Sequence, residues 1–358
     1  MRKAKILFVL GCLIGLLNYA YAQRKVAINE TQEVDSAFAA LVRDFRSIRQ
    51  FSRSTLKLPL LYQTGGYEVR LADSALNIPK QRLVLTNPFG ADAYPLSYSV
   101  IYQNCLVSLF APGYFACYTI EGFQRNLPLE EQLNTKQFEK HWLLDGYLVG
   151  LSSGSYWQYS PGTGWEPYSK QVPFKDRPKL YEDKDYLVYN ECRGEFGGQI
   201  YFYHKRTQKT YSTESVCAVR VSHSKQGYEV LSNLGHGTGH TRKVLIRDPR
   251  KLPKVSDLMF DLYSIELFGG FKWQNQDIYL LNLAGYTHLA TLSDRIFVIV
   301  DPLFNGRLYT HRPLSTDYGS MSLINLDHYG TGKDREVACM VTRGDQIVVL
   351  NWHELHRW

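Results

Sequence analysis

Gly146-Tyr147-Leu148-Val149-Gly150 is the stretch that decides the fold, because it returns in altered form along the chain. The other copies are Asp185-Tyr186-Leu187-Val188-Tyr189, Gly227-Tyr228-Glu229-Val230-Leu231 and Asp277-Ile278-Tyr279-Leu280-Leu281. Each copy opens with Gly or Asp and continues into an aromatic or β-branched run, the composition of a strand that follows a turn. The first three copies lie 39 and 42 residues apart, counted from their tyrosines, and the fourth follows after about 50.

Short apolar runs of the same kind fill the chain after Pro59. Most are four to seven residues long, and Gly, Pro, Asn and Asp divide them. This is the pattern of β-hairpins. The sequence predicts strands at Tyr67–Leu71, Arg82–Thr86, Tyr98–Tyr102, Leu106–Phe110, Tyr114–Ile120, Tyr147–Leu151, Tyr186–Tyr189, Gln199–His204, Tyr228–Leu231, Val244–Ile246, Ile278–Leu281, Arg295–Val300, Val337–Val341 and Gln346–Leu350.

The spacing of the copies indicates a repeat architecture. The four-stranded blades of β-propellers repeat at roughly 40–50 residues. We therefore predict one all-β domain over residues 59–358, a β-propeller of about five to seven degenerate blades. A double β-sandwich or a large barrel is the alternative, because the repeats are degenerate and contain no Trp-Asp dipeptide. One short helix is expected around Leu129–Leu144, where Pro128 suits the first turn.

The N-terminus has the pattern of a secretory signal. Three basic residues precede an apolar run from Ile6 to Leu17, and Ala20-Tyr21-Ala22 supplies the small residues that a signal peptidase reads. We predict that residues 1–22 are a signal peptide, cleaved before Gln23, and that the protein is periplasmic or extracellular. The apolar run is too short for a membrane span of about 20 residues, and no later stretch approaches that length. A lipoprotein signal at Cys12 is disfavoured, since it leaves only five apolar residues before the cysteine.

Residues 23–58 are predicted to form a separate N-terminal segment with one amphipathic helix from Val34 to Phe51. Apolar side chains recur there with steps of four and three residues, which is the helical period. Several arginines form a second stripe, for which docking to an anionic lipid surface is one interpretation. Packing of the apolar face on the β domain is favoured, because acidic residues interrupt the basic stripe.

Charge and cysteine usage exclude several classes of protein. The formal charge is +7, three of the basic residues belong to the predicted signal peptide, and no dense basic run follows it, which excludes a nucleic-acid footprint. No Cys-x-x-Cys motif or His/Cys cluster occurs, so we expect no metal and no cofactor. In an oxidising compartment the cysteines can form bridges. Cys105 and Cys117 are the preferred pair, because they lie symmetrically about a predicted hairpin turn at Ala111-Pro112-Gly113. Cys192 and Cys217 come second, since a strand is expected between them.

An aromatic hairpin is the first candidate for a binding surface. Tyr159, Trp165 and Tyr168 surround the loop Ser160-Pro161-Gly162-Thr163-Gly164, and exposed Trp and Tyr are favoured at binding hot spots. Trp165 follows the turn directly, so we expect it to be exposed and Trp157 to be the core residue. The other interpretation is ordinary strand packing.

Two loops supply the remaining site candidates. Glu191 and Glu195 are two carboxylates on a glycine-rich loop, where acid–base chemistry on a glycoside is one interpretation. A turn built on the glycines, with Arg193 paired to a glutamate, is the favoured one. His236 and His240 lie on a second glycine-rich loop. Contact with a ligand is one interpretation, and a loop whose histidines have no functional role is the other. No Gly-x-Ser-x-Gly nucleophile motif is present.

No catalytic motif stands out, which favours a binding role over catalysis. We therefore predict an exported binding or interaction protein that uses the loops of a propeller and recognises an unidentified extracytoplasmic glycan or protein. Whether it is an enzyme stays open. The alternative is an extracytoplasmic hydrolase of glycans or peptides, with carboxylates or a histidine in a central funnel.

Overall fold

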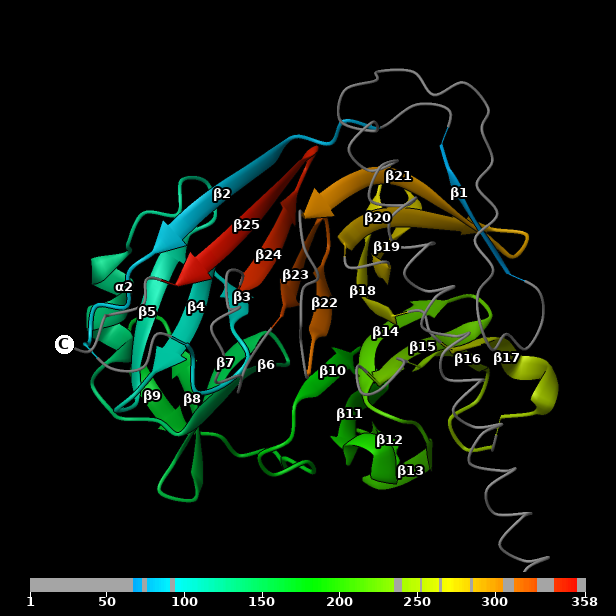
Figure 1. The fold of residues 1–358 in the computed structure, drawn as a ribbon. Coiled ribbons are helices and arrows are strands. Elements are labelled where there is room, and N and C mark those ends of the chain that lie inside the picture. The colour runs from blue at the N-terminus through cyan, green and yellow to red at the C-terminus, as the bar shows by residue number, and fades with distance from the viewer. Residues whose placement is uncertain are drawn as a thin grey trace, which may run out of the picture.

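The computed structural model describes residues 67–352, apart from 73–75, 91–93, 235–239, 252, 264–265, 284–285, 305–311 and 327–337. Antiparallel β-strands make up most of this part of the chain, so the predicted all-β class is confirmed (Figure 1). The predicted signal peptide and the helix at Val34–Phe51 lie outside the described residues. Within the described part, no helix is long and apolar enough to cross a membrane.

The described strands fall into antiparallel groups that follow one another along the chain, each called a meander below. The first two meanders are β3–β5 and β6–β9, with bounds Val100–Tyr102, Cys105–Phe110 and Tyr114–Thr119, then Lys140–Leu144, Tyr147–Ser152, Ser155–Ser160 and Gly164–Pro167. The next two are β10–β13 and β14–β17, with bounds Lys179–Glu182, Tyr186–Cys192, Gly198–His204 and Lys209–Glu214, then Ala218–Ser224, Gly227–Leu234, His240–Ile246 and Leu258–Tyr263.

The chain ends with two further meanders, β18–β21 and β22–β25. Their bounds are Glu266–Trp273, Gln276–Leu283, Tyr286–Ser293 and Ile296–Phe304, then Leu314–Tyr318, Met321–Asn325, Cys339–Arg343 and Gln346–Trp352. Two N-terminal strands join these later meanders in parallel: β1 (Glu68–Leu71) pairs with β21, and β2 (Lys80–Leu85) pairs with β25. The N-terminal part of the described chain is thereby fastened to its C-terminal part.

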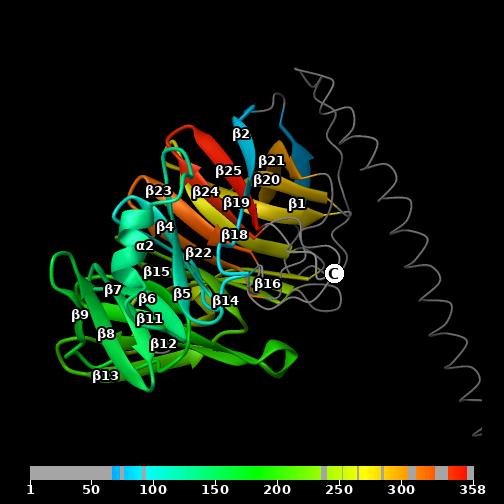
Figure 2. The ribbon, with the colours of Figure 1, turned by 90° about the vertical axis from the view of Figure 1, so that its left-hand side faces the viewer.

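The hydrophobic core is divided into clusters that lie between consecutive meanders. Trp142 of β6 packs with Leu187 of β11, for example, and Tyr186 of β11 packs with Tyr228 of β15. One further cluster closes the ring, because it joins Leu106 of β4 to Val348 of β25. The sheets are thus arranged around a common centre as a β-propeller, which confirms that prediction (Figures 1 and 2).

The repeated sequence stretches coincide with equivalent strands of this ring. The four copies form β7, β11, β15 and β19, which are the second strands of four successive meanders. Each copy opens at the hairpin turn that leads out of the first strand, which explains its initial Gly or Asp. Gly146 has a φ of 80° and Gly227 one of 136°, conformations that residues with a side chain rarely adopt.

Two meanders meet directly at the centre of the ring. Arg220 of β14 pairs with Ser315 of β22 in parallel, which joins β14–β17 and β22–β25 into one nine-stranded sheet. Arg220 is only 5% exposed, and its guanidinium contacts Asp277 at 3.3 Å and Asp317 at 3.1 Å. Gly270 makes room for this side chain, since a Cβ there would lie 3.2 Å from Arg220 Nη1 and 2.8 Å from a backbone oxygen.

The predicted helix around Leu129–Leu144 is shorter than expected. Helix α2 spans Leu127–Leu133, begins at Asn126, whose Oδ1 accepts the Leu129 N–H at 3.1 Å, and carries Pro128 in its first turn. It lies on β5, on the outer side of the ring (Figure 2). The chain then continues into strand β6 at Lys140, because Trp142 and Leu144 pack between two meanders.

Candidate ligand-binding cavity

A cavity of about 230 Å³ opens where the first strands of five meanders begin. These strands are β3, β6, β10, β14 and β22, so residues from distant parts of the chain converge on it. Loops that enter inner strands gather at one end of a propeller, which makes that end the usual place for a binding site. The lining includes Ser97, Tyr98, Lys140, His141, Trp142, Asp176, Arg177, Leu180, Asn190, Glu191, Cys192, Cys217, Ala218, Arg312 and Leu314.

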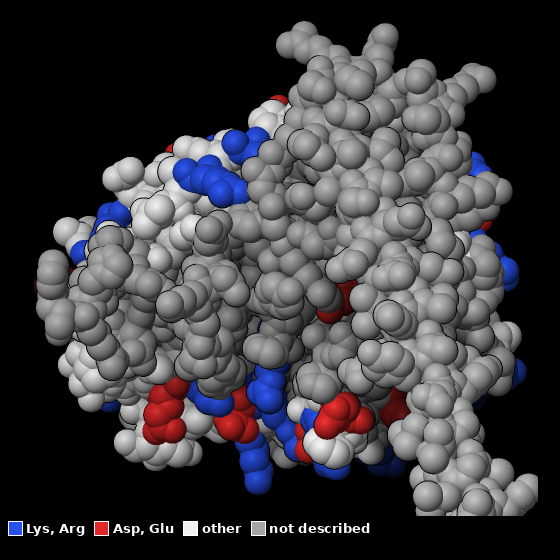
Figure 3. Space-filling model, viewed as in Figure 1, with Lys and Arg blue, Asp and Glu red and all other residues white. Residues whose placement is uncertain are grey.

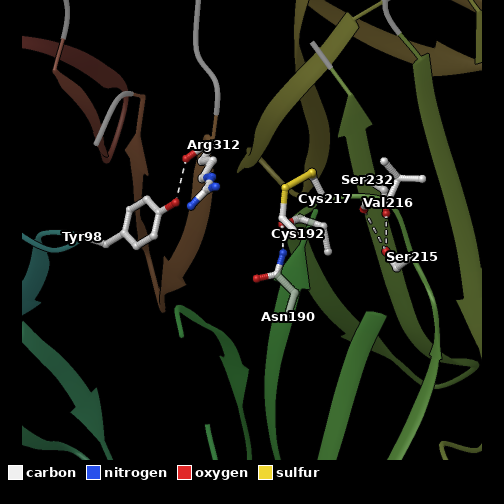
Figure 4. Close-up of a disulfide and its surroundings, with 9 residues drawn as sticks. Tyr98, Asn190, Cys192, Ser215, Val216, Cys217, Ser232 and Arg312 are labelled. Atoms are coloured by element: carbon white, nitrogen blue, oxygen red, sulfur yellow. Dashed lines mark hydrogen bonds between the residues drawn. A yellow bond between two sulfur atoms is a disulfide. The ribbon is translucent and has the colours of Figure 1, made fainter. Parts of the chain in front are cut away.

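A disulfide between Cys192 and Cys217 forms part of the cavity wall (Figure 4). Cys192 ends β11, and Cys217 lies directly before β14. The strands between them, β12 and β13, extend outward in the sheet, and the chain returns to the ring centre past the end of β11. The strand predicted between the two cysteines therefore does not keep them apart, and the second-choice pairing is the one that forms.

The preferred pair, Cys105 and Cys117, is not bonded, so that prediction is wrong. The hairpin pairs Phe110 with Tyr114, and its register places Cys117 opposite Val107 instead of Cys105. The turn is therefore centred one residue later than its sequence symmetry suggests. A shift of one residue at the centre moves the paired partner by two positions, which separates the two sulfurs. Both thiols are buried in the core.

Asn190 lines the cavity and has an unpaired hydrogen-bond acceptor among the described residues. Its side-chain amide donates to the Ala218 carbonyl at 3.0 Å, which fixes the orientation of the group. Asn190 is only 5% exposed, so its Oδ1 is shielded from water. This oxygen has no hydrogen-bond partner among the described residues. Figure 4 shows this oxygen turned away from the disulfide, toward the side where Tyr98 and Arg312 lie. Buried polar atoms are nearly always paired, so this oxygen calls for a partner.

Glu191, a predicted site residue, does lie at the cavity, but its carboxylate is fully engaged. Oε2 accepts from Arg177 at 3.0 Å and from Tyr201 at 2.9 Å, and Oε1 accepts two bonds from Arg193, at 2.8 and 3.0 Å. Hydrogen bonds from Arg193 and Tyr201 hold the pKa of the Glu191 carboxyl below its ordinary value. Glu195 is exposed on the short 3-10 helix Gly194–Phe196 and does not line the cavity, so the two carboxylates do not converge there.

A second carboxylate, Asp176, lies at the cavity without having been predicted. Lys140 contacts it at 3.2 Å and also donates to its backbone carbonyl. The hydrogen bond from Lys140 holds the pKa of the Asp176 carboxyl below its ordinary value. Near neutral pH both carboxylates of the cavity are therefore ionised, and each is paired with a cationic side chain.

His141 and Ser97 form a close pair on the cavity wall. Ser97 Oγ lies 2.6 Å from His141 Nδ1, and His141 Nε2 lies 3.2 Å from the Val107 carbonyl. A carbonyl can only accept, so Nε2 carries a proton, and in the neutral ring the serine hydroxyl then donates to Nδ1. Both side chains are buried. The sequence offered no motif for this pair, because 44 residues separate its members.

The aromatic hairpin is not the exposed surface that the sequence predicted. Trp165 is 9% exposed, lies 4.3 Å from the Phe138 ring between centroids, and donates its indole N–H to the Leu133 carbonyl at the end of α2. Tyr159 is opposite it in the strand register and is 1% exposed. Trp157 is the more exposed of the two tryptophans and carries Lys136 over its ring. Helix α2 covers the hairpin beside the turn, which reverses the expected order of burial.

The remaining predicted residues lie apart from the cavity. Tyr168 lines a second cavity of about 420 Å³, where its hydroxyl donates to Asp145 at 3.3 Å and burial raises its pKa. Lysines pair with Asp145 and Glu182 there. On the face of the molecule drawn in Figure 3, basic and acidic side chains alternate along the lower edge of the view. His240 pairs with Asp261 on β16 and β17. His236 lies outside the described residues.

Comparisons with known proteins place the chain in no family. No protein-family model and no curated protein matches it. Similar solved structures include the computationally designed Ika8 protein, with 12% identity, a TM-score of 0.40, and 74% of this chain and 88% of that one covered. BamB from Moraxella catarrhalis has 12% identity, a TM-score of 0.35, and coverage of 74% and 71%. The N-terminal domain of Nup159 has 8% identity, a TM-score of 0.35, and coverage of 84% and 82%. At these scores none of them indicates a ligand or an activity for this chain.

Proposed function

We propose that the protein is an exported binding protein and that its ligand site is the cavity between the inner strands of the propeller. One observation carries this proposal: Asn190, which lines the cavity, has a buried side-chain oxygen without a hydrogen-bond partner among the described residues. A ligand that donates a hydrogen bond there removes the free-energy penalty of the unpaired oxygen. The Cys192–Cys217 bridge supports export, because disulfides persist mainly in oxidising compartments.

The size of the cavity limits what it can take. Its volume of about 230 Å³ lies below the roughly 300–1,000 Å³ of sites for drug-sized ligands. The cavity therefore suits a small molecule or the end unit of a longer chain. The walls combine apolar side chains such as Trp142 and Leu314 with fixed polar groups, which is the composition of a specific pocket.

The state of the two carboxylates supports binding over glycoside hydrolysis. A glycosidase needs one carboxyl group that stays protonated, which requires a raised pKa. At this cavity the pKa values of Glu191 and Asp176 are both lowered by bonded bases. Neither group is a proton donor near neutral pH.

The binding proposal is tested by the thermal stability of the protein in the presence of small polar compounds. We expect at least one compound among monosaccharides, amino-acid amides and dipeptides to stabilise the wild type, by about 2.7 kcal/mol at a concentration of 100 times its Kd. The Asn190→Leu variant, measured against its own unliganded melting temperature, should show little of this shift.

Asn233→Leu is the matched control. Asn233 is 4% exposed and also has a buried, unpaired Oδ1 among the described residues, but it does not line the cavity. Its variant should keep the full ligand-induced shift. Equal loss in both variants, or no shift with any compound, would count against a site at Asn190.

One observation favours a hydrolase as the second candidate: the contact of Ser97 Oγ with His141 Nδ1 at the cavity. In such a pair the histidine takes the hydroxyl proton as the serine attacks a carbonyl carbon. A fluorophosphonate probe reacts with serines activated in this way. Peptide mapping after incubation should show Ser97 unlabelled under the binding proposal, and labelling that disappears in His141→Gln would favour the hydrolase.

A further inference from the structure

The hydrogen-bond inventory of the cavity points to the class of its ligand. Its uncharged side-chain donors are already engaged inside the protein. Trp142 Nε1 donates to the Arg177 carbonyl at 3.0 Å, and the Tyr98 hydroxyl donates to the Arg312 carbonyl at 2.9 Å. The Asn190 amide donates to the Ala218 carbonyl, and the Ser97 hydroxyl donates to His141.

The acceptors, in contrast, have capacity to spare. Asn190 Oδ1 has no partner among the described residues, and a carbonyl oxygen that accepts one bond has a second lone pair. A ligand that fits must therefore bring donors. A peptide unit brings one C=O for every N–H, and the uncharged side-chain donors that could meet that C=O are already used. Each sugar hydroxyl brings its own O–H donor, so a sugar unit offers more donors for its size than a peptide unit does.

Existing ion pairs leave little charge in the cavity free to hold an ionic ligand. Lys140 pairs with Asp176, and Arg177 pairs with Glu191, so an ion entering the cavity has to compete with an existing partner. Arg312 is exposed to solvent, where water screens its charge. The lining carries three basic and two acidic side chains, so a donor-rich ammonium group meets a net positive wall.

Resting on the proposed function, we infer that the cavity binds the uncharged terminal sugar unit of a glycan, with one hydroxyl donating to Asn190 Oδ1. The ring's C–H face then lies against apolar wall residues such as Trp142 and Leu314. The size of the cavity agrees with one end unit of a chain rather than an internal stretch of it.

The test uses purified full-length exported protein and saturation-transfer NMR with affinities from calorimetry. The probes are uncharged methyl glycosides of hexoses, pentoses and N-acetylhexosamines, glucuronic acid as an anionic sugar, and N-acetyl amino-acid amides as peptide mimics. We expect binding of at least one uncharged glycoside. One of its monodeoxy analogues should bind the wild type about three- to tenfold more weakly than the parent glycoside does, as the loss of one hydrogen bond predicts.

Variants connect that hydroxyl to its acceptor. In Asn190→Leu the same deoxy analogue should bind as the parent glycoside does, within twofold, because the acceptor is gone. Asn233→Leu should keep the wild-type difference. If Asn190→Leu fails to fold, the deoxy series with the wild type still tests the inference. The inference is overturned if removal of no single hydroxyl weakens binding at least threefold.

The outcomes separate this inference from the proposed function. If amino-acid amides bind in a way that depends on Asn190 and no uncharged glycoside binds, the proposed binding site is supported and the sugar inference is overturned. Binding of glucuronic acid alone would do the same. If no probe binds, the sugar inference and the proposed site are both overturned.

Discussion

Arg220→Ala should lower the free energy of unfolding by about 3 kcal/mol or more, as expected when one partner of a buried ion pair is removed. Arg220 is 5% exposed and contacts Asp277 and Asp317 at the seam between β14, β18 and β22. Its removal leaves two carboxylates near each other without their shared cation, and it leaves a cavity where the long side chain was. Urea unfolding measures the difference.

Arg250→Ala is the control for an exposed arginine–aspartate pair. The Arg250 side chain is 64% exposed and contacts Asp248 at 2.8 Å. Exposed pairs contribute about 0–1 kcal/mol, so this variant should unfold close to the wild type. Equal effects of the two substitutions would show that Arg220 does not join the meanders in the way described.

The Arg220 effect should also depend on pH. Burial alone raises the pKa of the Asp277 carboxyl, but the charges of Arg220 and Lys272 outweigh it and hold that pKa below its ordinary value. A depressed pKa in the folded state stabilises the protein above the unfolded-state pKa, and this stabilisation is lost as the pH falls through the folded-state value. The difference between wild type and Arg220→Ala should therefore shrink below about pH 4.

Trp165→Ala should cost about 3–5 kcal/mol, as expected for a buried aromatic residue. Trp165 packs on Phe138 and stacks at 5.9 Å on Phe115, and its indole bonds to the end of α2. The substitution removes a hydrogen bond between α2 and β9 and the ring packing around it. Thermal and urea unfolding should both show the loss, with no role of this residue in ligand contact.

Trp157→Ala is the matched tryptophan control on the same hairpin. Trp157 is only partly buried, and Lys136 lies 4.1 Å from its ring centroid, a contact worth about 0.5–1 kcal/mol at an exposed site. Its replacement should cost clearly less than that of Trp165. A Trp165→Ala protein as stable as the wild type would restore the idea that this hairpin is a contact surface.

Much of the fold could be predicted from local pattern. Strand positions follow from alternating apolar runs, and the glycine or aspartate before Tyr147, Tyr186 and Tyr228 marks the turn into each second strand. These turns recur along the sequence with the same spacing as the meanders, so their spacing predicts the propeller. Helix α2 was recognisable from Pro128, but its end was not, because burial of Trp142 between two meanders decides where the chain becomes a strand.

The cavity could not be predicted in the same way, because non-local packing builds it. Cys192 and Cys217 meet only after β12 and β13 turn outward, and Ser97 meets His141 across the boundary of two meanders. Asn190 carried a weak signal: it is a polar residue within strand β11, directly after the apolar run Tyr186–Tyr189 and directly before Glu191. The sequence drew attention to the charged neighbour, whereas the structure gives the unpaired oxygen to the neutral one.

The most direct measurement is a crystal structure of the wild-type protein grown with the uncharged methyl glycoside that binds it most tightly. The account predicts one sugar unit in the central cavity, with a hydroxyl oxygen about 2.5–3.0 Å from Asn190 Oδ1 and the Asn190 amide still bonded to the Ala218 carbonyl. A sugar bound elsewhere on the molecule, with Asn190 Oδ1 bonded to another protein group, would contradict it.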